Sequence, residues 1–172
     1  MKTLFIGGVK SGKSHHAENY VLANSTFKIQ HSKPLSPVYL ATSEPFDEET
    51  KQKIERHRRG RSEHFLTIEE PLNLSAVLEP VKMPVLVECI TVWMSNMLHH
   101  GFAKEDIFHQ IDKLLATDKD IVFVQNDVGS GVIPDNTLAR EFINLSGVVA
   151  QKLAAGCDEV YHCIAGISTR IK

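Results

Sequence analysis

Eight residues near the N-terminus have the spacing of a phosphate-binding loop. They fit the pattern G-x-x-x-x-G-K-[ST] and comprise Gly7, Gly8, Val9, Lys10, Ser11, Gly12, Lys13 and Ser14. The glycines let successive backbone N–H groups close around an anion, and a following helix adds its positive N-terminal end. The lysine can reach the β- and γ-phosphates, and the serine hydroxyl can bind Mg²⁺. The segment predicts a nucleoside triphosphate site in which Lys13 is catalytic and Ser14 is a metal ligand.

A magnesium-bound nucleotide usually needs a carboxylate as well, at the end of a neighbouring strand. Glu88 closes the apolar run at 85–87, and Asp127 follows the apolar run at 121–124. Both positions suit a ligand site, because ligands of α/β proteins bind at the carboxyl ends of strands. We expect Glu88 to contact the nucleotide and its metal, and Asp127 remains a second candidate.

A basic segment, ERHRRGR at 55–61, places His57 among four arginines. One interpretation is a solvated helix face. A second is a triphosphate clamp, in which arginine forks hold phosphate oxygens and a neutral imidazole attacks phosphorus. A third is a nucleic-acid contact, which the nearby acidic residues weaken. From spacing alone, these three interpretations stay open.

Composition narrows the class of protein. The chain has 172 residues, which suits one domain over 1–172. A net charge of −2 gives no general attraction to nucleic acid or to an anionic membrane. No apolar run reaches the roughly 18 residues of a membrane span. The cysteines Cys89, Cys157 and Cys163 form no C-x-x-C pair, so we expect core packing in a reducing cytoplasm.

Apolar runs alternate with helical patterns along the chain. Strands are expected at 3–6, 37–42, 65–68, 85–90, 121–124 and 159–164, and helices at 14–23, 47–59, 91–99, 105–116 and 137–155. Asp135 or Asn136 should cap the start of the last helix, and Gly156 its end. This alternation predicts an α/β fold with a mostly parallel central sheet flanked by helices.

Taken as a whole, the sequence closely resembles the bifunctional adenosylcobinamide kinase / adenosylcobinamide-phosphate guanylyltransferase family of cobalamin biosynthesis. The matching stretches are GGVKSGKSHHAE at 7–18, YLATSEPFDEE at 39–49, KIERHRRGR at 53–61, TIEEP at 67–71, LVECITVWMSNML at 86–98, NDVGSGVIPDN at 126–136, LAREF at 138–142, QKLAAGCDEV at 151–160 and AGISTRIK at 165–172. They run nearly from end to end. The phosphate loop together with I-x-x-H-x-x-x-R is far more specific than the loop alone.

The resemblance implies two reactions on a RecA-like P-loop NTPase fold. ATP or GTP phosphorylates adenosylcobinamide, and GTP then donates GMP to that phosphate through a guanylyl-histidine, releasing pyrophosphate. The histidine corresponds to His57. Nucleotide contacts correspond to Gly7–Ser14, Ala41, Thr42, Ser43, Arg58, Arg59, Gly60, Arg61, Glu69 and Glu88, with Mg²⁺ on Ser14 and Glu88.

The resemblance also implies a homotrimer, and it has two local departures. The family commonly has Glu where Asp127 stands and often Asn where Ala150 stands.

Three alternatives for the function stay open. One is an enzyme with only the kinase or only the guanylyltransferase activity. Another is a regulatory GTP switch, although the N-K-x-D guanine reader is missing. The third is a nucleic-acid-binding ATPase, which would need a broader basic face.

Overall fold

The computed structural model describes residues 1–24, 36–44 and 64–172. In chain order its elements are β1 (Lys2–Gly7), α1 (Lys13–Ala23), β2 (Val38–Ala41), β3 (Leu66–Glu69), α3 (Leu74–Leu78), β4 (Val85–Glu88), α4 (Ile90–His99), α5 (Lys104–Ala116), β5 (Ile121–Asn126), α6 (Thr137–Gly156), β6 (Glu159–Ile164) and β7 (Ile167–Arg170). The described strands form one sheet in the order β3-β2-β4-β5-β1-β6-β7. All their pairings are parallel except that of β6 with β7. The predicted α/β class with a mostly parallel sheet is confirmed.

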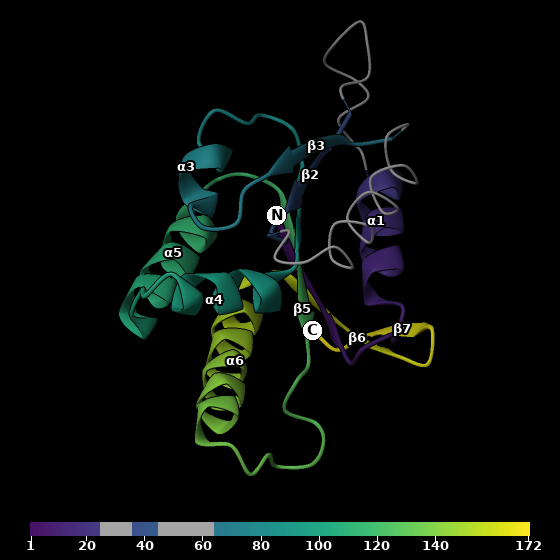
Figure 1. Cartoon of the computed structure of the whole chain (residues 1–172). Helices are drawn as coiled ribbons and strands as arrows, with labels where there is room; N and C mark the ends of the chain where they lie inside the picture. The colour runs from purple at the N-terminus through teal and green to yellow at the C-terminus, as the bar shows by residue number, and fades with distance from the viewer. Residues whose placement is uncertain (25–35, 45–63) are drawn as a thin grey trace, which may run out of the picture.

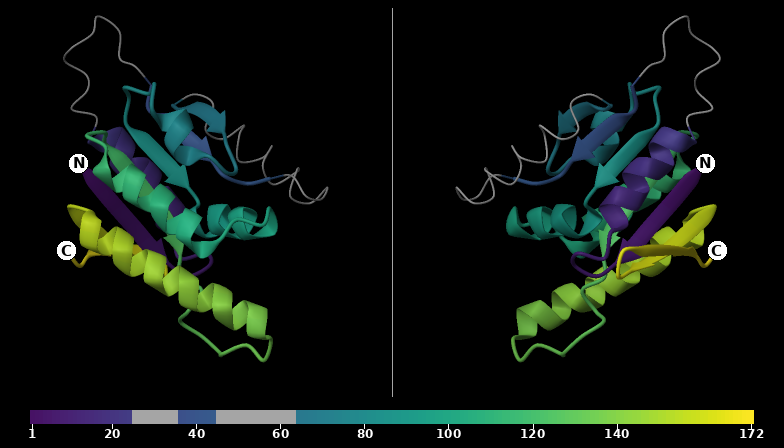
Figure 2. Two further views of the ribbon diagram at one scale, coloured as in Figure 1. Left: turned by 90° about the vertical axis from the view of Figure 1, so that its left-hand side faces the viewer. Right: turned by 90° about the vertical axis from the view of Figure 1, so that its right-hand side faces the viewer.

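Helices lie on both faces of this sheet (Figure 1). Among the described helices, α3, α4, α5 and α6 cover one face and α1 covers the other, as the two side views in Figure 2 also show. Strands buried on both faces explain the continuous apolar runs in the sequence. None of the described helices is long and apolar enough to cross a membrane.

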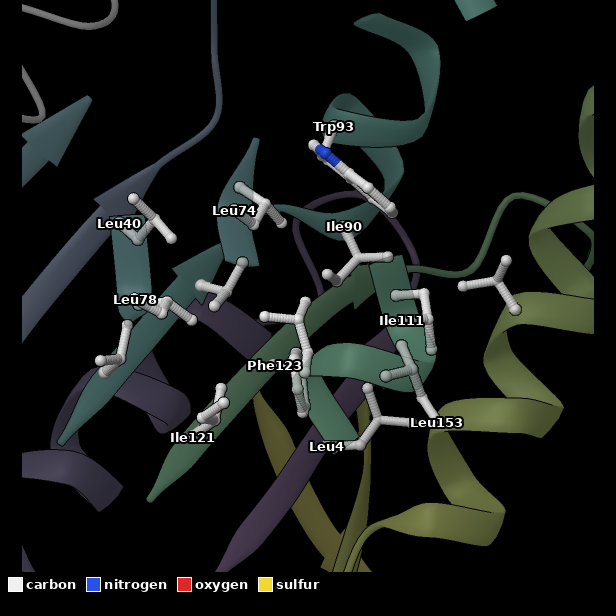
Figure 3. Packing of buried hydrophobic residues seen from close by; sticks show 14 of the residues in the cluster. Leu4, Leu40, Leu74, Leu78, Ile90, Trp93, Ile111, Ile121, Phe123 and Leu153 are labelled. Atoms are coloured by element: carbon white, nitrogen blue, oxygen red, sulfur yellow. The ribbon is translucent and has the colours of Figure 1, made fainter. Parts of the chain in front are cut away.

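Alternation along each strand divides the core in two. Leu4, Val87 and Phe123 belong to the larger cluster, under α3–α6, whose packing is shown in Figure 3. Phe5 and Val124 belong to the smaller cluster, under α1. Each fully buried aliphatic or aromatic side chain contributes about 1.5–3 kcal/mol of transfer free energy. Because side chains alternate along a strand, the position of a residue in β1, β4 or β5 tells which face of the sheet it occupies.

Two strand boundaries differ from the prediction. The strand expected at 85–90 ends at Glu88, because Cys89 is the N-cap of α4 and its carbonyl oxygen accepts from the Trp93 N–H at 3.0 Å. The strand expected at 121–124 runs on to Asn126, where it still pairs with Gly7 of β1. The first change arises from a local capping contact, and the second from pairing with a strand that is distant in the sequence.

The long helix α6 begins as expected and ends differently. Asn136 is its N-cap, and the side-chain oxygen accepts from the Ala139 N–H at 3.1 Å. Gly156 is the last helical residue and not the C-cap. The cap is Cys157, whose extended backbone leads directly toward β6, so this helix end does not need a left-handed residue. The helix expected at 47–59 lies outside the described residues.

Candidate functional site

The phosphate loop connects the end of β1 to the start of α1. Within it, the Ser11 N–H donates to the Gly8 carbonyl oxygen at 3.2 Å. Gly12 is the N-cap of α1 with a φ of 92°, which a side chain would strain. A Cβ on Gly7 would lie 2.2 Å from the carbonyl oxygen of Cys163, so β6 requires a glycine there. The predicted strand–loop–helix setting of the motif is present.

Two polar side chains of this loop lie in different settings. Lys13 Nζ donates to the Gly8 carbonyl oxygen at 3.1 Å, which keeps the ammonium over the loop. The Ser11 hydroxyl is buried and has no hydrogen-bond partner among the described residues. A bound anion would supply an acceptor for the Lys13 ammonium, which suits the nucleotide site predicted at Gly7–Ser14.

The structure brings Ser14 and Glu88 together, although they are far apart in the sequence. The Ser14 hydroxyl donates to Glu88 Oε1 at 2.8 Å. Glu88 ends β4 on the face that α1 covers, and β5 separates β4 from β1 in the sheet. A hydroxyl beside a carboxylate is a pair of hard oxygen ligands of the type that Mg²⁺ prefers. Across the described ranges, no group of three or more His, Cys, Asp or Glu residues could hold a metal. An ion held here would also take phosphate and water oxygens as ligands.

The segment Ala41–Ser43 begins with the last residue of β2 and continues past the same edge of the sheet. Thr42 is fully buried, and its hydroxyl donates toward the carbonyl oxygens of Glu88 and Cys89, at 3.1 and 3.0 Å. The same oxygen accepts from the Cys89 N–H at 2.8 Å. Thr42 therefore fixes the backbone that carries Glu88. Nucleotide contacts from Ala41, Thr42 and Ser43 stay a prediction.

Two further predicted carboxylates lie at this edge in different settings. Glu69 ends the outer strand β3, pairs in register with Ala41 and is exposed. Asp127 follows β5, and its carboxylate accepts from the Gly129 N–H at 3.1 Å and from the Ser130 hydroxyl. Asp127 thus serves the turn that follows it, which leaves Glu88 as the better metal ligand.

The basic part of the predicted site lies outside the described residues. It comprises His57, Arg58, Arg59, Gly60 and Arg61. Before this gap, the described chain ends at Glu44, whose carboxylate lies 3.0 Å from His100 Nε2 at the end of α4. Glu44 follows β2 at the carboxyl edge of the sheet, where the phosphate loop also lies.

Two supports of the site were not predicted from the sequence. The turn between β6 and β7 contacts the phosphate loop, because the Gly166 N–H donates to the Ser11 carbonyl oxygen at 3.0 Å and its own carbonyl oxygen lies 2.8 Å from His16 Nε2. Asn96, buried in α4, donates to the Thr42 carbonyl oxygen at 2.6 Å. In the sequence, the signal for Asn96 is a polar residue within an apolar helical stretch that includes Trp93 and Met97.

The thiols near the site are not activated nucleophiles. Burial raises the pKa of Cys89, and the neighbouring Glu88 carboxylate raises it further. Burial also raises the pKa of Cys163, beside Gly7. A thiol attacks phosphorus as its thiolate, so neither group suits covalent catalysis near neutral pH.

A family model and three related proteins all match the chain over nearly its whole length. Residues 3–171 match the family model described as cobinamide kinase / cobinamide phosphate guanyltransferase. The bifunctional adenosylcobalamin biosynthesis proteins CobU of Escherichia coli (strain K12) and Salmonella typhimurium (strain LT2) are each 34% identical over 191 residues, with 100% of both chains covered. The protein CobP of Pseudomonas aeruginosa, also named a bifunctional adenosylcobalamin biosynthesis protein, is 30% identical over 181 residues, with 100% of this chain and 98% of its own covered.

Solved structures are similar in fold at low sequence identity. A Pyrococcus horikoshii OT3 protein solved as Project ID PH0250 aligns with a TM-score of 0.53 and 10% identity, over 99% of this chain and 85% of its own. The KaiC-like protein PH0186 of the same organism aligns with a TM-score of 0.50 and 8% identity, over 94% and 69%. These matches agree with the α/β fold and its mostly parallel sheet.

Proposed function

The chain belongs to the cobinamide kinase / cobinamide phosphate guanyltransferase family, and from this premise we propose how its residues serve the two reactions. It is a bifunctional enzyme of adenosylcobalamin biosynthesis, with a kinase and a guanylyltransferase activity. The alternative of one activity alone is not favoured, because the relatives at 30–34% identity are named as bifunctional over their full length. The observation that carries the site assignment is the convergence of Lys13, Ser14 and Glu88 at one edge of the sheet.

In the kinase step, the phosphate loop binds the triphosphate of ATP or GTP. Backbone N–H groups of Gly8–Ser14 surround the phosphates, and Lys13 moves from the Gly8 carbonyl oxygen to the β- and γ-phosphates. The acceptor is the hydroxyl of adenosylcobinamide. A loose phosphoryl-transfer transition state depends mainly on positioning and on charge stabilisation, which fixed donors of this kind supply.

Ser14 and Glu88 are the residues that would hold Mg²⁺. Their 2.8 Å contact places a hydroxyl and a carboxylate oxygen side by side, and Thr42 holds the backbone of Glu88. When bound, the ion neutralises charge on the β- and γ-phosphate oxygens.

In the second step, we propose that His57 carries the guanylyl group. Direct attack of the adenosylcobinamide phosphate on GTP would bring two anions together, whereas a neutral imidazole avoids that repulsion. The imidazole nitrogen forms a bond to the α-phosphorus, and pyrophosphate leaves with the electrons of the broken P–O bond. The acceptor phosphate then displaces His57 from the guanylyl group. Arg58, Arg59 and Arg61 would bind the phosphate oxygens during both displacements.

The family also suggests an oligomeric state and a cellular compartment for this protein. We propose a homotrimer in the cytoplasm, acting on small molecules and not on nucleic acid. Val132, Ile133 and Leu138 are 94%, 79% and 71% exposed, and association between copies would remove such apolar surface from water. Sedimentation equilibrium checks this proposal. A mass near three chains is expected, and a monomer at micromolar concentration would contradict it.

A labelling experiment tests the proposed function. Incubation with Mg²⁺ and GTP labelled at the α-phosphate should leave acid-labile, base-stable label on the denatured protein, because a P–N bond to histidine has that stability. Adding adenosylcobinamide phosphate should transfer the label to a small molecule. Label that maps to His57 supports the two-step transfer. If the wild-type protein phosphorylates adenosylcobinamide and yet takes up no label, the guanylyl-histidine is wrong.

A further inference from the structure

Asn126 lies at the carboxyl end of β5, between the strand that leads into the phosphate loop and the strand that carries Glu88. Its Cα pairs with that of Gly7 in β1. On the other side, Glu88 pairs with Val124, two residues earlier in β5. Because side chains alternate along a strand, Asn126 shares the face of Val124, which α1 covers. The carboxamide therefore lies on the same face as Glu88, one pleat nearer the edge where phosphates bind.

The backbone of Asn126 is held on both sides. Its N–H donates to Thr91 Oγ1 at 2.9 Å, and the Thr91 hydroxyl donates back to the Asn126 carbonyl oxygen at 3.1 Å. The next N–H, of Asp127, donates to the Gly7 carbonyl oxygen at 2.9 Å. Contacts from α4 and β1 thus fix the position of this residue relative to the phosphate loop.

The side chain, in contrast, lacks a partner for its buried oxygen. Asn126 Oδ1 is buried without a hydrogen bond to any described residue. Leaving a buried acceptor unpaired is costly, and such groups are rare in native proteins. Gln125 is the informative neighbour. Its Oε1 is also unpaired, but it lies on the opposite face, where its Nε2 donates to the Ser146 carbonyl oxygen at 2.8 Å in α6. Of these two residues, Asn126 is the one whose carboxamide lies on the face of the phosphate loop.

We propose that Asn126 is a catalytic residue of the phosphoryl-transfer step, in which its carboxamide contacts both the terminal phosphate and the attacking hydroxyl. When both substrates are bound, the side chain turns so that its N–H donates to an oxygen of the γ-phosphate. Oδ1 then accepts from the acceptor hydroxyl and aligns it with the phosphorus. The acceptor O–P bond then forms and the bond from the γ-phosphorus to the β,γ-bridging oxygen breaks, so that nucleoside diphosphate leaves. The hydroxyl proton passes to an oxygen of the transferred phosphoryl group, since a carboxamide does not hold it. This role rests on the proposed kinase function.

Substitutions at 126 test the role in the full-length protein. Asn126→Ala should lower the kcat for adenosylcobinamide phosphorylation about 100-fold, which is typical for the loss of one fixed donor at a reacting oxygen. The KM for ATP should change by less than about threefold, since the loop that binds the phosphates is intact. The melting temperature should stay constant or rise, because the change removes an unpaired buried group. Asn126→Asp places a second carboxylate near Glu88 and the phosphates, so its kcat should rise as pH falls and the new group is protonated.

Gln125→Leu is the matched control, because it alters an adjacent buried amide on the opposite face. It should lower the melting temperature by several degrees and leave kcat within about twofold, since it breaks the contact with Ser146. The proposal is overturned if Asn126→Ala keeps a wild-type kcat, or if kcat, ATP affinity and melting temperature all fall together, which would indicate a structural role. A wild-type protein that does not phosphorylate adenosylcobinamide in the same assay would instead overturn the proposed function, and this role with it.

Discussion

Replacing Lys13 with alanine is expected to lower both transfer reactions by about 100-fold or more. Lys13 Nζ lies 3.1 Å from the Gly8 carbonyl oxygen, inside the loop that should receive the triphosphate. Its charge stabilises the phosphates in the ground state and the charge that develops during transfer, and loss of one such group commonly costs 100–1000-fold in rate, or about 3–4 kcal/mol. Steady-state assays of adenosylcobinamide phosphorylation and of GMP transfer measure the two effects separately.

Lys82→Ala is the matched control for this variant. Lys82 is exposed in the turn before β4, at the opposite edge of the sheet, and its removal changes the net charge by the same amount. It should leave both rates within about twofold. If Lys13→Ala phosphorylated adenosylcobinamide at the wild-type rate, the triphosphate would have to bind somewhere other than Gly7–Ser14.

The features predicted well from the sequence are those whose signal is local. The phosphate loop has a fixed spacing, and the apolar runs before Gly7 and Glu88 mark strands buried on both faces. Because all these strands are parallel, the residues that follow them reach the same edge, and Glu88 was expected near the loop for that reason. Its actual contact with the Ser14 hydroxyl agrees with this expectation.

What the sequence did not predict depends on partners distant in the chain. β7 and the turn before it are short. They support the phosphate loop through the hydrogen bond from the Gly166 N–H to the Ser11 carbonyl oxygen, and these two residues are 155 positions apart in the sequence. The bonds of the Thr42 hydroxyl to the backbone around Cys89 also join distant segments, and its contact with the nucleotide stays a prediction. Asn126 was not selected, because nothing in its local sequence tells which face of β5 it occupies or that Oδ1 is unpaired.

Replacing His57 with alanine is expected to separate the two activities. Guanylyl transfer should fall by about 1000-fold or more, because loss of a covalent nucleophile commonly removes most of the rate enhancement. The kinase should keep most of its rate, since phosphoryl transfer at the γ-phosphorus needs the phosphate loop, Ser14 and Glu88, and these residues are unchanged. The two products, adenosylcobinamide phosphate and adenosylcobinamide-GDP, can be separated chromatographically and counted in one reaction mixture.

His109→Ala is the matched control, because His109 is exposed on α5 away from the phosphate loop. It should retain both activities and take up label from α-labelled GTP as the wild-type protein does, whereas His57→Ala should take up none. Equal loss of both activities in His57→Ala would mean that the histidine serves nucleotide binding in general and not covalent transfer. Retained guanylyl transfer would mean that the acceptor phosphate attacks GTP directly. In that case the arginines at 58, 59 and 61 would have to overcome the repulsion between two anions that a neutral imidazole avoids.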